Sequence, residues 1–275
     1  MIDGAGTLGR RIATVYAAAG SDVRIFDLSE EQRAAARDHV SDHLADTAQT
    51  LGLSTEGPGR VETPGDLQAA VAGAWMVIES VPEHVELKTE VFGELDRLAE
   101  PDAILCTNSS SLPSSQMIGK VQHPERVLNT HYQQPPELNS VELMSCGRTD
   151  DGVISALMQR LPGYGLAPFR VRRESDGFIF NRIWAAIKRE CLMVIEEGVA
   201  APEDVDEMWR IFTAPGIRPF RLMDRVGLDV VLAIEEHYAS VRPGLPDGPR
   251  KLLREYIDQG RLGVKTGRGF YDEPS

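Results

Sequence analysis

A histidine and a glutamate in two consecutive strand-like segments have the residue types of an acid–base pair. His131 ends the run 127–131, and Glu142 lies inside the apolar run 141–144. A carboxylate that accepts a hydrogen bond from an imidazole fixes its tautomer and makes it a better base. A histidine alone is more often structural, and Glu142 could equally lie on an edge strand facing water. The sequence leaves both interpretations open.

The other histidines indicate no metal site, and we expect no bound metal. Two of them have the spacing of one helix face, but no third ligand follows nearby, whereas metal sites need three or four. The five histidines are His39, His43, His84, His123 and His237.

A glycine-rich motif near the start of the chain could bind a phosphate group. It has the pattern G-x-G-x-x-G and leads into a helical pattern. The first glycine allows a tight turn, the second lets a pyrophosphate approach the backbone, and the third lets helix and strand pack closely. The N–H groups at the helix start would then bind the anion. The motif consists of Gly4, Ala5, Gly6, Thr7, Leu8 and Gly9.

An acidic residue at the end of the next strand strengthens this interpretation. Asp27 ends the strand-like run 23–27, where a carboxylate would bind the adenosine ribose hydroxyls of a dinucleotide. A carboxylate there repels a 2′-phosphate, so the sequence favours NAD over NADP. Only Met1, Ile2 and Asp3 precede Gly4, so the first strand is expected to be a stub or to begin upstream.

Two further sets of polar residues could belong to a site or to ordinary local structure. The run Asn108–Leu112 follows a strand end, and its hydroxyls could simply cap the next helix. Asn181 lies early in the helical pattern that begins near Phe178, where a polar side chain is an ordinary surface position. Local patterns do not distinguish these interpretations.

The elements that would position these residues change in character near residue 173. Up to there, short apolar runs alternate with helical patterns, which predicts an α/β fold with a Rossmann-type, doubly wound parallel sheet covered on both faces. Beyond it only helical patterns occur, as at 178–197 and 228–238. We therefore expect an NAD-binding domain at residues 1–173 and an all-helical domain at 174–275.

Composition argues against several classes of partner. The formal net charge of −13 opposes binding to nucleic acid and to anionic membranes. The three cysteines are far apart and form no C-x-x-C pair, which fits a reducing compartment. The chain contains neither an apolar run of transmembrane length nor a signal-peptide pattern. We therefore expect a cytoplasmic protein.

Taken in order along nearly the whole chain, these features resemble the 3-hydroxyacyl-CoA dehydrogenase family. The second half opens with the segment 177–182 (GFIFNR), and the chain closes with 262–272 (LGVKTGRGFYD), which is similar to the family's C-terminal signature. The resemblance implies hydride transfer between NAD and C3 of a 3-hydroxyacyl or 3-oxoacyl substrate. It also implies a coenzyme A thioester as the substrate and a place in fatty acid metabolism.

The same resemblance implies a role for each matching residue. His131 would take or return the substrate hydroxyl proton, Glu142 would orient His131, and Ser110 would hydrogen-bond the reacting oxygen. Asn181 would hold the carbonyl side of the substrate, and the helical domain would form a homodimer and close over a cleft between the domains. Further contacts to NAD are implied for Glu83, Lys88, Asn108 and Lys265.

Three features depart from the family pattern. The first strand is short. Tyr132–Pro135 stands where the family has Phe-Phe-Asn-Pro, so Gln134 replaces an asparagine that contacts the cofactor, and the loop to Glu142 is one residue shorter. Short-chain members carry lysines after the second strand that meet the coenzyme A phosphates, whereas this chain has no lysine before Lys88 and offers only Arg33 and Arg37 nearby.

Two alternatives therefore stay open beside the main interpretation. The first is a dehydrogenase or ketoreductase of the same fold that acts on a 3-hydroxy acid or a polyketide-like 3-oxo compound without coenzyme A, which the missing lysines favour. The second is a non-catalytic, crystallin-like structural relative. Retention of Ser110, His131, Glu142 and Asn181 argues against the second alternative.

Overall fold

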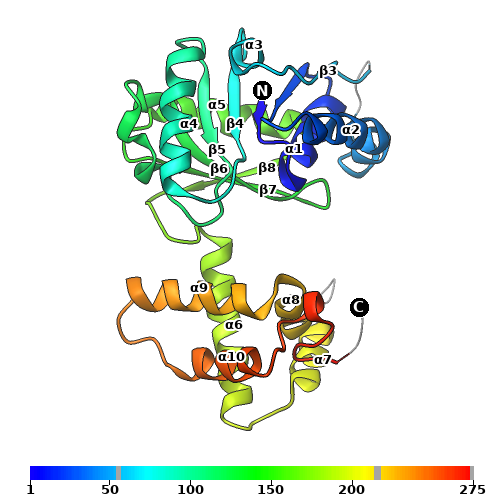
Figure 1. Cartoon of the computed structure of the whole chain (residues 1–275), viewed down its shortest axis with the longest axis vertical. Coiled ribbons are helices and arrows are strands. Elements are labelled where there is room, and N and C mark those ends of the chain that lie inside the picture. Colours follow the sequence, from blue (N-terminus) through cyan, green and yellow to red (C-terminus); the bar gives the residue numbers. More distant parts are fainter. Residues whose placement is uncertain (54–56, 214–217, 273–275) are drawn as a thin grey trace. The chain divides into compact units, whose positions relative to one another are not determined.

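The chain folds into two compact units in the computed structural model, which describes residues 1–53, 57–213 and 218–272 (Figure 1). Unit 1 spans Met1–Ile179 and unit 2 spans Phe180–Ser275. The division lies a few residues after the boundary at 173–174 that the sequence suggests. The last strand ends at Val171 and the next helix begins at Phe180, so the intervening segment still belongs to unit 1.

Unit 1 contains an eight-stranded sheet in the order β3-β2-β1-β4-β5-β6-β7-β8. The chain moves outward from β1 first in one direction and then in the other, which confirms the expected doubly wound α/β fold. In such folds ligands bind beside the carboxyl ends of the strands where the direction reverses, which are β1 and β4 here. The strands are β1 (Ile2–Asp3), β2 (Val23–Phe26), β3 (Val61–Glu62), β4 (Met76–Glu79), β5 (Ile104–Thr107), β6 (Val127–Gln134), β7 (Leu138–Ser145) and β8 (Ala167–Val171).

One strand pair departs from the parallel sheet that the alternating pattern predicts. β6 and β7 are antiparallel, whereas the other neighbouring pairs in the described sheet are parallel. The chain between them, residues 135–137, is too short for a helical crossover, and strands joined by such a turn must run in opposite directions. This hairpin places residues 131 and 142 directly opposite each other.

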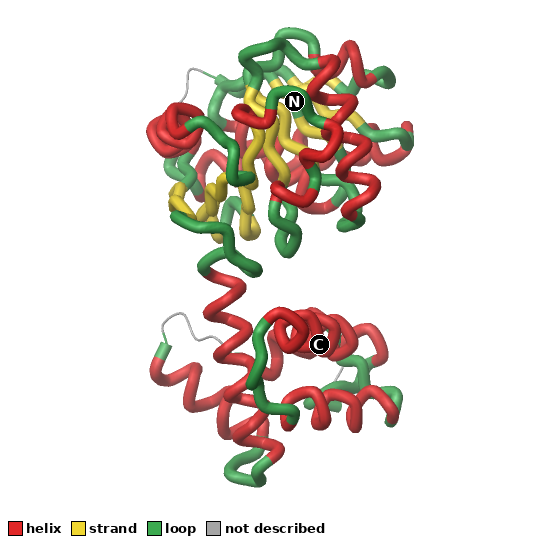
Figure 2. Tube along the Cα trace, turned by 90° about the vertical axis from the view of Figure 1, so that its left-hand side faces the viewer, coloured by secondary structure: helices red, strands yellow, loops and turns green. Residues whose placement is uncertain are grey.

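Helices cover both faces of this sheet (Figure 2). On one face, α1 (Thr7–Ala18), α2 (Glu30–Thr50) and α5 (Asp151–Arg160) contribute Ile12, Val40 and Leu157 to one apolar core. On the other face, α3 (Leu67–Val71) and α4 (Val85–Leu98) contribute Val71, Phe92 and Leu95 to a second core. Ser29 caps α2 through its side chain, as its position before Glu30 predicts.

Strand β1 has two residues but occupies the centre of the sheet. Ile2 is in register with Ile25 on β2 and with Ile78 on β4. Asp3, which follows, is buried beside Glu79 of β4. Burial, reinforced by the negative charges of Glu79 and Asp27, raises the pKa of Asp3 to about 7. An ionised carboxylate at this position is therefore unfavourable at neutral pH.

Unit 2 is built from helices around a separate core. Leu192, Phe220 and Leu253 lie at its centre, and Phe270 packs edge-on against Phe220 with ring centroids 4.7 Å apart. The C-terminal motif of the sequence thus completes this core. The helices are α6 (Phe180–Glu196), α7 (Pro202–Phe212), α8 (Pro219–Val226), α9 (Leu228–Val241) and α10 (Gly248–Asp258).

Within the described ranges, no helix combines the length and the apolar character that crossing a membrane requires.

The substitution Asp3→Asn should stabilise the protein, and more at alkaline than at acidic pH. Because the folded-state pKa is raised, the folded protein keeps a proton that the unfolded chain has lost, and stability falls as pH rises from the ordinary aspartate value towards pH 7. Asparagine removes this cost, so the unfolding free energy should increase by on the order of a few kcal/mol at about pH 8 and by less at about pH 5. Urea unfolding of the wild type and of Asp3→Asn measures the free energy of unfolding at both pH values. An equal gain at both would mean that Asp3 does not titrate between them.

Candidate active site

The glycine motif forms the turn between β1 and α1. Helix α1 has no acidic residue in its first turn and no side-chain cap at Gly6, which suits an anion at its positive end. A Cβ atom on Gly6 would meet nothing within 4 Å, which leaves room for a pyrophosphate at the backbone. A Cβ atom on Gly9 would lie 2.0 Å from the carbonyl oxygen of Gly4. Gly6 thus keeps the approach open, whereas Gly9 permits helix packing.

Asp27 lies at the carboxyl end of β2, beside this turn. Its Oδ2 accepts a hydrogen bond from the Ala5 N–H at 2.9 Å, and its Oδ1 accepts one from the Ser29 N–H at 2.9 Å. The carboxylate is thereby held next to the glycine turn, where the ribose of a dinucleotide would meet it. The open space at Gly6, the uncapped helix end and this carboxylate fit NAD.

His131 and Glu142 form a buried pair on the β6–β7 hairpin. Nδ1 of His131 lies 2.8 Å from Oε2 of Glu142, and the two residues are 4% and 3% exposed. Because an ionised carboxylate can only accept hydrogen bonds, Nδ1 carries the proton and Nε2 is left as the basic nitrogen of the ring. Glu142 is therefore paired with the histidine, and it does not face water as the alternative interpretation requires.

Residues around this pair hold it in place, and local sequence patterns do not single them out. Oε1 of Glu142 accepts a hydrogen bond from the Ile179 N–H at 2.7 Å. The ring of Phe178 stacks on the imidazole with centroids 4.8 Å apart and planes 24° apart. Phe178 has a positive φ of 54°, which is unfavourable for a side chain of this size. In the sequence, the Gly177-Phe178 pair just before α6 is the one local sign of an unusual backbone conformation here.

Gln133 is a further neighbour of the pair. Its Nε2 lies 3.4 Å from Oε2 of Glu142 and 3.5 Å from Nδ1 of His131. With the proton on Nδ1, the amide can donate only to the carboxylate. The imidazole, the Ile179 N–H and the Gln133 amide thus all contact the oxygens of this buried carboxylate, as a buried polar group requires.

The serine-rich segment after β5 forms a loop tied to Glu83. One oxygen of Glu83 accepts hydrogen bonds from the Ser109 hydroxyl, from the Ser111 hydroxyl at 2.9 Å and from the Ser111 N–H at 3.2 Å. Partial burial opposes ionisation, but these hydrogen bonds and the charge of Lys88 together keep the pKa of Glu83 below its ordinary value. Ser110 lies between the two residues so held.

The same loop also contacts the β6–β7 hairpin. Oδ1 of Asn108 accepts a hydrogen bond from the N–H of Tyr132, the residue after His131, at 3.0 Å. The Ser109 hydroxyl accepts one from the Leu112 N–H at 2.9 Å. The Ser109 and Ser111 hydroxyls therefore organise the loop itself, and the 3₁₀ turn that follows, Ser114–Gln116, has no side-chain cap.

Lys88 is buried in an ion-pair cluster. Its Nζ lies 2.6 Å from Oε1 of Glu79 and 3.3 Å from Oε2 of Glu83, and it also donates to the Val81 carbonyl at 3.1 Å. A direct contact between Lys88 and NAD stays a prediction. The sequence motifs do not select Glu79. An acidic residue at the end of an apolar buried strand is unusual, however, and could have marked it as a candidate site residue.

The two remaining candidate residues belong to unit 2. Lys265 forms an ion pair with Asp229, and Asn181 is the second residue of α6. Gln134, which departs from the family pattern, ends β6, and its carbonyl oxygen lies 3.3 Å from a guanidinium nitrogen of Arg11.

Two glycine substitutions should separate cofactor binding from folding. Gly6→Ala adds a methyl group where the structure has space, so the melting temperature should stay close to wild type while NADH affinity falls. Gly9→Ala places that methyl group against the Gly4 carbonyl and should lower the melting temperature itself. Thermal unfolding and a fluorescence titration with NADH measure the two effects. Undiminished NADH affinity in Gly6→Ala would contradict a pyrophosphate at this turn.

Comparisons with known proteins agree with this geometry. The family model described as "3-hydroxyacyl-CoA dehydrogenase, NAD binding domain" matches residues 1–175, and the one described as "3-hydroxyacyl-CoA dehydrogenase, C-terminal domain" matches residues 177–273. A 3-hydroxybutyryl-CoA dehydrogenase of Mycobacterium tuberculosis (strain ATCC 25618 / H37Rv) is 33% identical over 276 residues, which are 98% of this chain and 96% of that protein.

Solved structures give the same result. The (S)-3-hydroxybutyryl-CoA dehydrogenase of Ralstonia eutropha is 29% identical with a TM-score of 0.88, over 100% of this chain and 98% of that one. A diketoreductase is also 29% identical, with a TM-score of 0.80 over 98% of this chain and 96% of that one. The resemblance noted in the sequence is thereby confirmed, as is NAD as the cofactor: the chain is an NAD-dependent oxidoreductase that belongs to the 3-hydroxyacyl-CoA dehydrogenase family.

Proposed function

We propose that this chain interconverts a 3-hydroxyacyl thioester of coenzyme A and the corresponding 3-oxoacyl thioester, with His131 as the acid–base residue. The observation that carries the proposal is the buried contact of 2.8 Å between His131 and Glu142. It lies in the same unit as a glycine turn that fits NAD. An imidazole paired in this way can exchange a proton with an alcohol, which hydride transfer at the neighbouring carbon requires.

The bound NAD supplies the acceptor or donor of the hydride. In the oxidative direction, Nε2 of His131 accepts the proton of the C3 hydroxyl, and the carboxylate of Glu142 stabilises the resulting imidazolium. In the reductive direction, the protonated His131 returns that proton to the carbonyl oxygen. Glu142 can stabilise the imidazolium because hydrogen bonds from the Ile179 N–H and the Gln133 amide hold its carboxylate in place.

The remaining candidate residues receive their roles from the family match. We assign Ser110 to a hydrogen bond with the reacting oxygen and Asn181 to the carbonyl side of the substrate. Contacts to NAD are assigned to the glycine motif and to Asp27, Glu83, Lys88, Asn108 and Lys265. Residues 1–173 form the NAD-binding domain in this proposal, and residues 174–275 form the domain for substrate binding and dimerisation.

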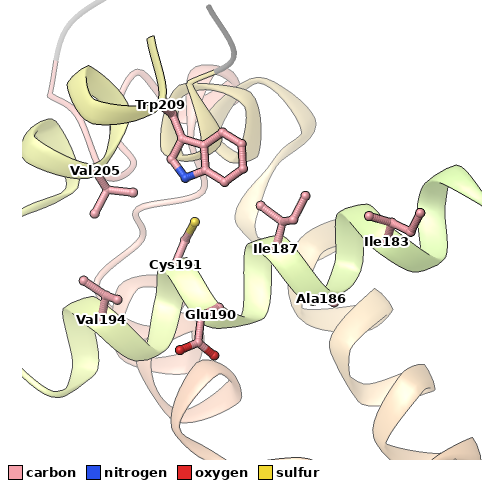
Figure 3. A pocket seen from close by; sticks show the side chains of 8 residues that line it. All are labelled: Ile183, Ala186, Ile187, Glu190, Cys191, Val194, Val205 and Trp209. Atoms are coloured by element: carbon pink, nitrogen blue, oxygen red, sulfur yellow. The ribbon is translucent and has the colours of Figure 1, made fainter. Parts of the chain in front are cut away.

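An apolar surface on unit 2 supports a homodimer. A pocket of about 460 Å³ lies between α6 and α7, and Trp209 and Val205 of α7 project towards Cys191 of α6 (Figure 3). Met208 and Phe212, also on α7, are exposed. Such a patch commonly marks a protein interface, and a second copy is the usual partner in enzymes of this size.

Sedimentation should show a dimer, and a monomer at micromolar concentration would contradict this assignment.

A cytoplasmic location and a place in fatty acid metabolism complete the proposal. The three cysteines, Cys106, Cys146 and Cys191, are buried and free, which fits a reducing compartment.

A screen of 3-oxo compounds tests the substrate class. We expect the highest kcat/KM for acetoacetyl-CoA, lower values for short thioesters that lack the nucleotide part of coenzyme A, and the lowest for free 3-oxo acids and diketones. The similarity to a diketoreductase and the absence of lysine before Lys88 support the alternative without coenzyme A. Equal or higher kcat/KM for the free compounds would decide for it. Binding of NADH without turnover of any 3-oxo compound would instead favour the non-catalytic relative.

Replacing His131 tests the acid–base assignment. His131→Gln should lower kcat by roughly 10²–10⁴-fold, the usual contribution of a positioned acid–base group, while NADH binding is retained. His123→Gln is the matched control, because the His123 side chain is 59% exposed and its ring pairs with Glu125, not with the hairpin pair. Initial rates of NADH consumption measure the effect, and a His131→Gln enzyme with wild-type kcat would remove this residue from the mechanism.

A further inference from the structure

A circuit of hydrogen bonds surrounds the loop that carries Ser110. It starts at Glu79, the last residue of β4, which is fully buried. One oxygen of Glu79 lies 2.6 Å from Nζ of Lys88, and the other accepts a hydrogen bond from the Thr107 hydroxyl at 2.7 Å. The oxygen of that hydroxyl accepts one from the Ser109 N–H at 3.1 Å. This first arm therefore reaches the loop from β5.

The second arm reaches the same loop through Lys88 and Glu83. Nζ of Lys88 lies 3.3 Å from Oε2 of Glu83. The other oxygen of Glu83 accepts hydrogen bonds from both neighbours of Ser110, namely Ser109 and Ser111. One carboxylate oxygen thus holds the loop on both sides of Ser110, and the circuit closes at Ser109.

The distribution of charge couples the two arms. Glu79 and Glu83 share the single ammonium of Lys88, and Glu79 and Lys88 are both out of contact with water. A buried charge that loses its partner is costly. If Glu79 were neutral, Glu83 would be the carboxylate left to pair with Lys88. Because the Glu83 side chain is 36% exposed, it can move, and the oxygen that binds Ser109 and Ser111 would move with it.

We propose that Glu79 is a positioning residue for the hydride-transfer reaction, which holds Ser110 in place through Thr107 on one side and through Lys88 and Glu83 on the other. The proposal rests on the function given above, in which Ser110 binds the reacting oxygen. Because Lys88 and Glu83 are also assigned contacts to NAD, removal of Glu79 should raise KM for NADH as well, and kcat at saturating NADH is the quantity that reports on Ser110. A displacement of a reacting-site contact by about 1 Å can cost roughly 100-fold in rate.

A double-mutant cycle between Glu79→Gln and Ser110→Ala separates positioning from a merely structural role. Glu79→Gln alone should lower kcat by roughly 10- to 100-fold. In the Ser110→Ala background it should lower kcat by less than about twofold, because both changes remove the same contact. A structural role for Glu79 predicts that the two factors multiply, and that result would overturn the proposal.

Two companion variants keep the cycle interpretable. Thr107→Val is nearly isosteric and interrupts only the first arm, so it can replace Glu79→Gln if that protein does not fold. We expect it to lower kcat less than Glu79→Gln does, again only when Ser110 is present. Glu62→Gln is the same chemical change at an exposed position on β3, and it should leave kcat and the melting temperature unchanged.

Amide hydrogen exchange tests the positioning without any substrate. The N–H groups of Ser109 and Ser111 are hydrogen-bonded to the circuit, so in Glu79→Gln their exchange should become faster by about tenfold or more. Amides within α1 should keep their wild-type rates. Unchanged exchange at Ser109 and Ser111 would overturn the proposal. If the wild-type protein reduces no 3-oxo compound, the proposed function fails, and the exchange rates still decide whether Glu79 holds the loop.

Discussion

The register between β6 and β7 is the constraint on which the candidate site depends. It sets Glu142 opposite His131 in an antiparallel pair, and a shift of β7 by one residue would turn Glu142 to the other face of the sheet. The resulting contact is buried, so the protein itself must satisfy the carboxylate. It does so on both oxygens, with the imidazole on one and the Ile179 N–H on the other. The segment before α6 is thereby tied to the hairpin.

At the carboxyl edge of the sheet, two further carboxylates are also held by hydrogen bonds and a neighbouring charge, but their pKa values shift in opposite directions. Burial raises the pKa of Glu79 even though Lys88 and Thr107 favour its ionised form. The pKa of Glu83 is instead lowered, because the serine hydrogen bonds and the charge of Lys88 outweigh its partial burial. Hydrogen bonds in such a low-dielectric environment are strong, and unpaired groups are costly. The difference in burial therefore shifts the pKa values of the two carboxylates in opposite directions.

Two features at this edge oppose stability. Asp3 places a carboxyl group at the centre of the sheet, next to the glycine turn, and Phe178 adopts a left-handed backbone conformation. Such costs persist only where the surrounding structure determines the position. Phe178 stacks on His131, so its strained backbone is linked directly to the orientation of the imidazole. For Asp3, the charge of Lys88 offsets part of the cost of ionisation.

The sequence by itself determined the features that depend on neighbours along the chain. The alternation of strands and helices, the glycine turn and Asp27 follow from periodicity and turn chemistry, and β2 lies within a residue of its expected position. The order of motifs also identified the family. Tertiary structure alone decided that β6 and β7 are antiparallel, that Glu142 meets His131, and that Glu79 and Lys88 anchor the serine loop. Strand pairing and burial join residues far apart in the sequence, and no local pattern records which of them will meet.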